Sequence, residues 1–186
     1  APLAKLVEAV ALGQKTGAGF YRKQGKDILV LDIAKGDYRP SGEKPSEAVQ
    51  AILAIKHPGE KLAALRASDD PQAQFVWSIL CDLFHYSAYH LADIANSARE
   101  VDFAMRWGYG WKQGPFETWQ AAGWKQVAEW IREDIAAGKT MSNAPLPAWV
   151  FDGRDGVHGN EGSYSAAANG VSPRSKHPVY ARQAFP

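Results

Sequence analysis

The sequence has a single cysteine, Cys81, among 186 residues, so no disulfide can form within the chain. Such sparse cysteine usage favours a reducing, cytoplasmic compartment. An excess of either charge is also missing: 21 lysines and arginines stand against 20 aspartates and glutamates, for a net charge of +1. This balance gives no electrostatic field that would attract nucleic acid or an anionic membrane surface. We therefore expect neither nucleic acid nor a membrane as a partner.

Long apolar runs are missing as well. No stretch approaches the roughly 18 apolar residues that a membrane helix needs. The first twelve residues include Lys5 and Glu8 and lack the apolar centre of a signal peptide. The chain also lacks an initiator methionine, which we expect of a processed protein or of a piece cut from a longer one. What is present, 46% hydrophobic and 22% charged residues, is ordinary for a globular protein.

The first forty residues predict a short helix followed by a β-ribbon. The helix covers residues 3–12, with one apolar face made of Leu3, Leu6, Val7 and Val10. Gly13 stands where a helix-ending glycine is expected. Successive side chains over 28–33 are expected to face opposite sides of a strand, and Gly25 and Gly36 mark turns on either side of it. This pattern indicates a two-stranded ribbon within about 20–39. So short a ribbon must lie on something larger.

The middle of the chain predicts a helical bundle. Two short helices cover 46–56 and 59–67. A longer helix begins with Asp70 as its N-cap and Pro71 at its first position. Its apolar stripe is predicted at Val76, Leu80, Leu83, Ser87, Leu91 and Ile94, and is widened by Phe75, Ile79 and Phe84. A stripe of this length is typical of the central helix of a bundle.

Start and stop signals then alternate towards the C-terminus. Ser97–Glu100 is a capping box, and the helix that it starts should end at Gly108–Gly110, where both glycines are expected to have positive φ. Gly114-Pro115 starts the next helix and Gly123 stops it; a further helix follows over 124–137. The fold class is thus mainly α: a helical bundle with a small β-ribbon near the N-terminus and an irregular C-terminal tail from about residue 151.

The glycine-rich stretch Gly13–Tyr21 contains the residue types of a phosphate-binding loop, but in the wrong order. A P-loop places its lysine after the second glycine of the motif, whereas Lys15 precedes Gly17. A dinucleotide loop needs a third glycine after Gly17 and Gly19, and a strand before it instead of a helix. The pattern therefore favours the end of a helix, where the dipole repels an anion and Lys15 satisfies the last carbonyls.

Polar side chains on the long helix are the other candidates for chemistry. His90 and Asp93 are three residues apart and could hydrogen-bond, as could Asp82 and Tyr86, while His85 and His90 are spaced poorly for a metal. We interpret this as a polar stripe on a largely buried helix; an autonomous enzyme would require the groups to converge in a pocket. Cys81 has no basic neighbour in sequence and is expected to be a small buried apolar group.

Two motifs resemble the C-terminal helical domains of 3-hydroxyacyl-CoA dehydrogenases. The stretch LGQKTGAGFY at Leu12–Tyr21 is similar to the motif that closes the first helical domain; its family positions are Gly13, Lys15, Gly17, Gly19 and Phe20. The stretch AREVDFAMRWGYGWKQGPFETWQAAGW at Ala98–Trp124 resembles the second hallmark, with family positions at Asp102, Gly108, Gly110, Gly114, Pro115, Phe116 and Gly123. Together they cover about a fifth of the chain.

The resemblance implies a fold like the C-terminal domain of 6-phosphogluconate dehydrogenase and a division into four parts. Residues 1–22 would end a first helical domain, 23–68 would be a ribbon and short-helix spacer, 69–150 a second helical domain, and 151–186 a linker or tail. This order resembles long bacterial β-oxidation enzymes, some with a fused enoyl-CoA hydratase domain. The chain would then be an excised piece of such an enzyme.

In that family a Rossmann domain binds NAD and oxidises the substrate, while the helical domains cover the acyl-CoA cleft and make the dimer contact. The resemblance thus implies NAD for the full-length enzyme, none for this chain, and partners in the Rossmann and other domains of the parent. No residue here receives a catalytic, cofactor-binding or metal-binding role. The family's usual Asp near the end of the Gly-Pro-Phe helix is Gln120, which favours packing over substrate contact. A helical protein-interaction module is the alternative.

Overall fold

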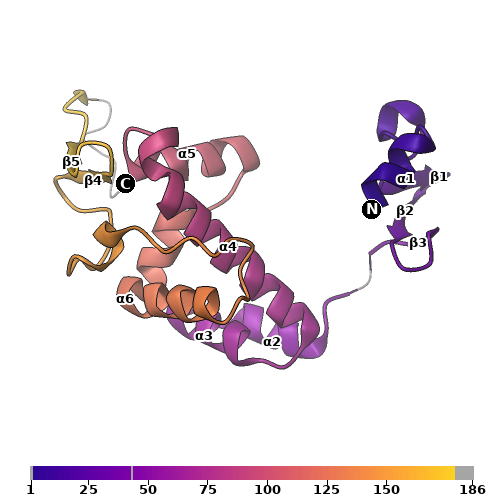
Figure 1. Ribbon diagram of the computed structural model, residues 1–186, viewed down its shortest axis with the longest axis horizontal. Coiled ribbons are helices and arrows are strands. Elements are labelled where there is room, and N and C mark those ends of the chain that lie inside the picture. The colour runs from indigo at the N-terminus through magenta and orange to yellow at the C-terminus, as the bar shows by residue number, and fades with distance from the viewer. Residues whose placement is uncertain (1, 43, 179–186) are drawn as a thin grey trace. The chain divides into compact units, whose positions relative to one another are not determined.

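The computed structural model describes residues 2–42 and 44–178 (Figure 1). Its contacts divide the chain into two compact units, Ala1–Pro45 and Ser46–Pro186, called unit 1 and unit 2 below. This division falls inside the expected spacer 23–68, so that the spacer's strands lie in unit 1 and its short helices in unit 2. The assignment of residues to a first and a second helical domain stays a prediction.

Unit 1 contains one helix, a 3-10 turn and a three-stranded antiparallel sheet. The elements are α1 (Pro2–Glu8), η1 (Gln14–Thr16), β1 (Tyr21–Gln24), β2 (Asp27–Asp32) and β3 (Asp37–Pro40). The strand order is β1-β2-β3, with Tyr21 opposite Val30 and Leu31 opposite Tyr38. The predicted ribbon is confirmed, and β3 extends it to a third strand. The reversals use Gly25 and Gly36, whose φ angles of 61° and 74° favour glycine.

The first helix is shorter than predicted. It ends at Glu8 and not at Gly13, because Val10 adopts a φ of 54° and takes the chain out of helical geometry. Gly13, with φ 125°, precedes η1 and does not cap α1. The predicted helix over 3–12 therefore extends four residues too far, since an apolar period alone does not reveal where a helix ends.

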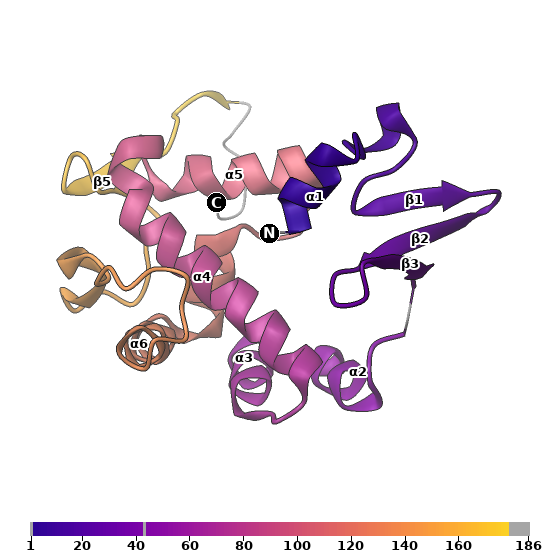
Figure 2. The same cartoon turned by 45° about the vertical axis from the view of Figure 1, so that its right-hand side comes forward.

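Unit 2 is the helical bundle. It contains α2 (Glu47–Ala54), α3 (Pro58–Ala67), α4 (Pro71–Ile94), α5 (Ala98–Tyr109), α6 (Pro115–Ala136), η2 (Ala148–Phe151), β4 (Gly162–Ser165) and β5 (Gly170–Pro173). The long helix α4 packs against α3, α5 and α6. Figure 2 shows α2 and α3 beside the N-terminal half of α4 and α5 beside its C-terminal end. The mainly helical fold with a small N-terminal sheet is therefore confirmed.

Local capping explains where these helices start. The Asp70 carboxylate accepts the N–H groups of Gln72 and Ala73, at 2.8 and 3.2 Å, and Pro71 occupies the first turn. At the start of α5, the Glu100 carboxylate accepts both the N–H and the hydroxyl of Ser97, at 2.5 and 2.9 Å. Both predicted helix starts are confirmed.

The face that α4 buries agrees with the predicted stripe only in part: Phe84, Ser87 and Leu91 are buried, whereas Phe75 and Ile79 are 65% and 51% exposed. Its buried side chains include Ala73, Trp77, Cys81, Phe84, Ala88 and Leu91. Leu83 is only half-buried, and Ile94 is 51% exposed. Two apolar faces lie side by side on this helix, and the bundle covers the one with Trp77 and Phe84 because their larger apolar surfaces gain more from burial.

Aromatic side chains of α6 form the centre of the core. Trp119 stacks on Trp124 with ring centroids 4.1 Å apart, and Phe84 of α4 lies 5.7 Å from Trp119. Both indoles are satisfied: the Trp119 N–H donates to the carbonyl of Trp124, and the Trp124 N–H to that of Val150. Gly123, with φ 103°, leaves helical geometry and kinks α6 between these rings, which confirms the break that the sequence predicted there.

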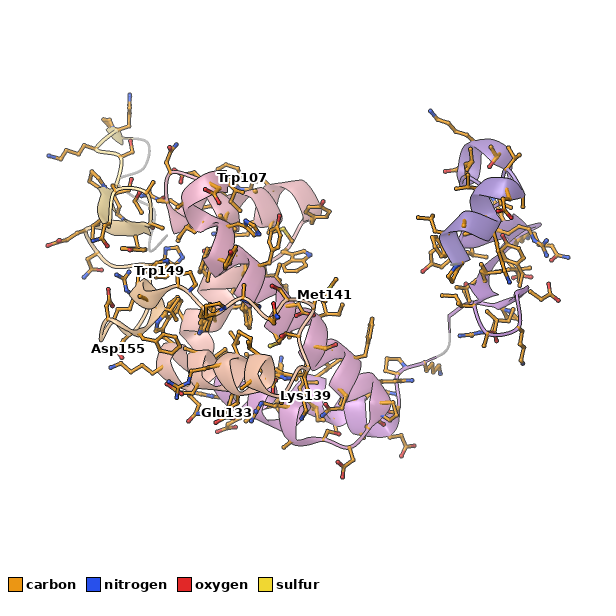
Figure 3. All side chains as sticks on the ribbon, in the orientation of Figure 1. Trp107, Glu133, Lys139, Met141, Trp149 and Asp155 are labelled. Carbon is orange, nitrogen blue, oxygen red and sulfur yellow. The ribbon has the colours of Figure 1, made fainter. Side chains whose placement is uncertain are left out.

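The C-terminal segment is partly ordered into a β-hairpin. Strands β4 and β5 pair antiparallel, and Asn169 with φ 46° helps to form the connecting turn. Both strands fall within the tail that was expected to be irregular, while residues 179–186 of that tail lie outside the described residues. Figure 3 labels Trp149, whose ring lies 4.8 Å from that of Tyr164 on β4 and joins this segment to the core. Among the described helices, none combines the length and apolar character required to cross a membrane.

Candidate functional site

The second hallmark motif folds around the side chain of Asp102. This residue lies on α5, and its carboxylate accepts the N–H groups of Phe116 and Glu117 at the start of α6, at 2.9 and 3.2 Å. The N-cap residue of α6, Gly114, has no side chain to perform this role. Asp102 therefore caps a helix from fourteen residues away, and its negative charge also favours the positive end of the α6 dipole.

Gly114 is required by this contact. A Cβ built on Gly114 would lie 2.2 Å from Asp102 Oδ1 and 2.3 Å from Asp102 Cα, which no side chain tolerates. Gly110 has a different reason to be glycine, because it ends α5 with φ 69°. Gly108 has neither reason: it lies inside α5 without a positive φ, and a Cβ would meet nothing within 4 Å. The prediction of positive φ at Gly108 was wrong, since α5 continues through it to Tyr109.

The same carboxylate binds a histidine from the C-terminal segment. His158 Nε2 lies 2.6 Å from Asp102 Oδ2, and His158 Nδ1 lies 2.9 Å from the hydroxyl oxygen of Ser163. The side chains of His158 and Asp102 are 1% and 2% exposed. Burial raises the pKa of Asp102, while the hydrogen bond from His158 acts in the opposite direction.

This Asp–His–Ser order is that of a hydrolase triad, but its burial excludes that chemistry here. Ser163 is 1% exposed, so no substrate carbonyl can reach its hydroxyl. The arrangement instead satisfies four polar groups that would be costly to bury alone. Its effect is structural: it fastens the segment that leads into β4 to the Gly-Pro-Phe turn.

Gln120 adds a second fastening next to the first. Its side-chain oxygen accepts the N–H groups of Val157 and His158, both at 2.9 Å, and its amide donates to the carbonyl of His158 at 3.1 Å. Gly156 gives it room, because a Cβ there would lie 2.1 Å from Gln120 Oε1. An aspartate could accept but not donate in this place, so the glutamine suits a packing role.

The first hallmark motif forms a closed loop in unit 1. Five of its backbone N–H groups donate to acceptors within the loop or next to it: those of Leu12, Gly13, Thr16, Gly17 and Gly19. The chain is pinched at Gly19, where a Cβ would lie 2.9 Å from Gly13 Cα. Lys15 and Phe20 are exposed. Because these N–H groups are already satisfied, they are not available to hold a phosphate.

The polar stripe of α4 does border a cavity. Asp82, His85, Tyr86, Tyr89 and His90 line a hollow of about 220 Å³ that Met141 and Ser142 close from the following segment. His85 Nε2 is buried and has no hydrogen-bond partner. Asp93 does not line the hollow; it is 77% exposed and lies 3.9 Å from His90 Nδ1. The groups thus share a hollow without a hydrogen-bonded acid–base pair, and within the described residues no three His, Cys, Asp or Glu side chains are placed to hold a metal.

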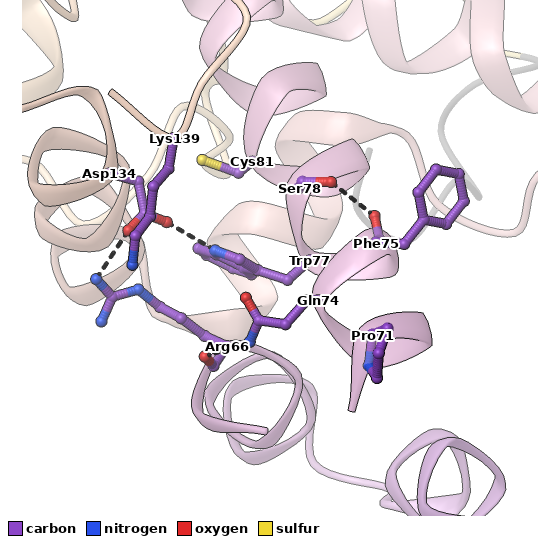
Figure 4. A pocket seen from close by; sticks show the side chains of 9 residues that line it. All are labelled: Arg66, Pro71, Gln74, Phe75, Trp77, Ser78, Cys81, Asp134 and Lys139. Atoms are coloured by element: carbon purple, nitrogen blue, oxygen red, sulfur yellow. Dashed lines mark hydrogen bonds and ion pairs between the residues drawn. The ribbon is translucent and has the colours of Figure 1, made fainter. Parts of the chain in front are cut away.

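A second buried carboxylate connects three helices at a larger cavity of about 520 Å³ (Figure 4). Asp134 on α6 accepts the Trp77 indole N–H at 2.7 Å and the Arg66 guanidinium at 3.1 Å. Cys81 lines the same cavity, and burial together with the charges of Asp134 and Asp82 raises the pKa of its thiol to about 12. A thiol with so high a pKa is no nucleophile at neutral pH.

Sequence reasoning missed His158, Ser163 and Asp134. None of them stands in a periodic pattern or beside its partner in the chain: His158 binds Asp102 across 56 residues, and Asp134 binds Trp77 across 57. The one available signal was histidine in the Gly-rich stretch 156–162, where a large polar side chain needs a partner if the segment is buried.

Known proteins with much longer chains match most of this chain. A Bacillus subtilis protein named probable 3-hydroxyacyl-CoA dehydrogenase is 36% identical over 159 residues, which cover 86% of this chain and 19% of that protein. Putative fatty acid oxidation complex trifunctional enzymes of Rickettsia felis and Rickettsia prowazekii are 28% and 25% identical over 155 and 153 residues. No protein-family model and no solved structure matches the chain.

The chain spans about a fifth of the length of these relatives. The match to the Rickettsia felis protein covers 80% of this chain, whereas the two motifs make up about a fifth of it. The chain is therefore homologous to one segment of longer proteins named 3-hydroxyacyl-CoA dehydrogenase or fatty acid oxidation complex trifunctional enzyme, as its two motifs indicated.

Proposed function

We propose that the chain is a helical substrate-cleft and assembly segment of an NAD-dependent 3-hydroxyacyl-CoA dehydrogenase of fatty-acid β-oxidation. The observation that carries the proposal is the cap that Asp102 provides to α6 through Phe116 and Glu117. This cap holds α5 and α6 at a fixed angle, because the Asp102 carboxylate on α5 binds the backbone at the start of α6. In this proposal the segment positions neighbouring parts of the enzyme and performs no chemistry itself.

Two features of the described residues support a chain that does not itself bind a dinucleotide. Binding NAD in a Rossmann crevice requires parallel strands joined by helices, and both sheets described here are antiparallel. The N–H groups of the Gly13–Gly19 loop are used internally. NAD and the acyl-CoA substrate therefore belong, in this proposal, to the parent enzyme, and the chain alone is inactive.

The partners follow from the same proposal. They are the Rossmann domain of the parent and, in a trifunctional arrangement, an enoyl-CoA hydratase domain; a homodimer of the parent is compatible with it. The names of the Rickettsia relatives, which describe trifunctional enzymes, support a parent with several domains. The single buried cysteine supports a cytoplasmic location.

The test compares the complete reading frame with this chain. We expect the full-length protein to reduce acetoacetyl-CoA with NADH, and residues 1–186 to show neither this activity nor saturable binding of NAD or ATP in calorimetric titration. Lys15→Ala should leave these titrations unchanged. Saturable NAD or ATP binding by residues 1–186 that Lys15→Ala abolishes would show that the glycine loop is a nucleotide site.

A helical protein-interaction module without an enzyme is the second candidate. The side chains of Trp107 and Tyr109, near the end of α5, are 74% and 75% exposed, which is costly for aromatic rings without a partner. An apolar groove of about 270 Å³ between α4 and α5 lies nearby in the fold, lined in part by Leu83, Val101 and Met105. A full reading frame without dehydrogenase activity would favour this candidate.

A further inference from the structure

Unit 1 exposes most of its large apolar side chains. Leu6, which is 8% exposed, is the one large apolar side chain that is buried within residues 2–42. Four more, Leu29, Val30, Leu31 and Tyr38, are half-buried. Eight are between 44% and 63% exposed: Leu3, Val7, Val10, Leu12, Phe20, Tyr21, Ile28 and Ile33. A soluble protein rarely leaves so many apolar groups open to water in so short a segment.

One buried and four half-buried large apolar side chains are too few to make a unit of this size stable by itself. Domains of about 40 residues need disulfides, metals or a partner to fold. Unit 1 contains no cysteine, and its described residues hold no cluster of metal-binding side chains. The remaining source of stability is burial against another surface.

Six of the exposed side chains line a single groove between α1 and the first two strands. They are Leu3, Val7, Leu12, Phe20, Tyr21 and Ile28, and the groove has a volume of about 860 Å³. The Gly13–Gly19 loop forms part of the wall of this groove. The two ends of the loop lie close together there, because the backbones of Gly13 and Gly19 are in contact. Ile33 is equally exposed but lies outside this groove, which makes it a control.

We propose that the unit 1 groove is an interdomain docking surface, covered by an apolar helical surface from the remainder of the parent chain. This rests on the proposed function. The relatives support such an occupant, because the matched segment is only 19% of their length. The charge of the rim agrees: Lys23 lines the groove and Lys15 stands on its loop, so the partner helix should carry carboxylates beside its apolar stripe.

A dissociable ligand fits these observations less well. A small molecule would cover the groove only while bound, whereas the unit needs permanent burial to stay folded. The groove is also open and lacks a set of converging polar groups to orient a ligand; its charged lining residue is Lys23 alone. A covalently connected helical surface meets the requirement without a concentration dependence.

The test places Val7→Asp and the control Ile33→Asp in two backgrounds, residues 1–186 and the full-length protein. In residues 1–186 both side chains are exposed, so both variants should match the wild type in thermal midpoint. In the full-length protein Val7→Asp should lower the midpoint or prevent folding, and Ile33→Asp should not. Hydrogen exchange in α1 and β1 should be at least about tenfold slower in the full-length wild type than in residues 1–186.

Three outcomes would overturn the proposal. One is a Val7→Asp full-length protein as stable as the Ile33→Asp control. Another is a dimer of residues 1–186 in light scattering that Val7→Asp makes monomeric, which would assign the groove to a second copy of the chain. The third is saturable binding of palmitoyl-CoA to residues 1–186 that Val7→Asp removes. Dehydrogenase activity of the full-length wild type reports on the proposed function separately, so that either proposal can fail alone.

Discussion

Asp102 and His158, 56 residues apart, hold the C-terminal segment of unit 2 against the turn between α5 and α6. Their Oδ2 and Nε2 atoms are 2.6 Å apart, and neither side chain is more than 2% exposed. The carboxylate at the same time caps α6 through Phe116. One buried charge thus connects the helical hallmark to the segment before β4, and its partners are what make its burial tolerable.

Replacing His158 with alanine should destabilise the protein strongly. The change leaves the Asp102 carboxylate with one partner fewer and removes the partner of the Ser163 hydroxyl, which breaks a buried pair and should cost about 3–5 kcal/mol. Urea unfolding measures the effect. His90→Ala is the control, because His90 is 36% exposed and its distance to Asp93 is 3.9 Å, and it should change stability by less than about 0.5 kcal/mol. Equal costs for the two variants would contradict the structural role of His158.

The pH dependence of stability should depend on Asp102. Its pKa is raised by burial above the ordinary value of 3.8. A carboxyl group raised in this way adds stability that is complete below the unfolded pKa and is lost as the pH rises through the folded pKa. Asp102→Asn does not titrate. The unfolding free energy of the wild type relative to Asp102→Asn should therefore fall as the pH increases above about 4.

Asp152 offers a control of opposite sign. A hydrogen bond from Arg154 lowers the pKa of Asp152, so its contribution is present above pH 3.8 and is lost as the pH falls through the folded pKa. Unfolding curves of wild type, Asp102→Asn and Asp152→Asn across pH 3 to 7 distinguish the two. A difference between wild type and Asp102→Asn that does not vary with pH would count against a raised pKa at Asp102.

The burial of Phe116 and the partial exposure of Leu83 predict that Phe116→Ala lowers the free energy of unfolding more than Leu83→Ala does. Phe116 is fully buried, so Phe116→Ala should cost about 3–5 kcal/mol. Leu83, which the apolar stripe of the sequence placed in the core, is only half-buried, and Leu83→Ala should cost less than about 2 kcal/mol. Denaturant midpoints of the two variants decide this. If Leu83→Ala lost more unfolding free energy than Phe116→Ala, the buried face of α4 would be the one that the sequence predicted.

Local signals predicted the helix starts, because each depends on residues within one turn. Asp70 with Pro71, Ser97 with Glu100 and Gly114 with Pro115 all stand next to the helices they begin. The buried face of α4 was ambiguous, since two apolar stripes satisfy the same period and only the neighbours α3 and α6 select one. The contacts of His158 were beyond such reasoning, because the pairing of polar groups distant in sequence leaves no periodic trace.

Gly108 and Gly114, two of the four family glycines in the second motif, should respond in opposite ways to alanine. In Gly114→Ala the new Cβ would lie 2.2 Å from Asp102 Oδ1, and Asp102 cannot retreat because His158 and the Phe116 N–H hold its carboxylate. We expect a loss of about 1–3 kcal/mol or more, together with faster amide exchange at the start of α6. Gly108 lies inside α5 with open space around it, so Gly108→Ala should stabilise the protein by about 0.5–1 kcal/mol through helix propensity. Thermal and urea unfolding of both variants test whether the glycine before Pro115 is there for the approach of Asp102. If Gly114→Ala were as stable as Gly108→Ala, the close contact between Gly114 and Asp102 would be absent in solution.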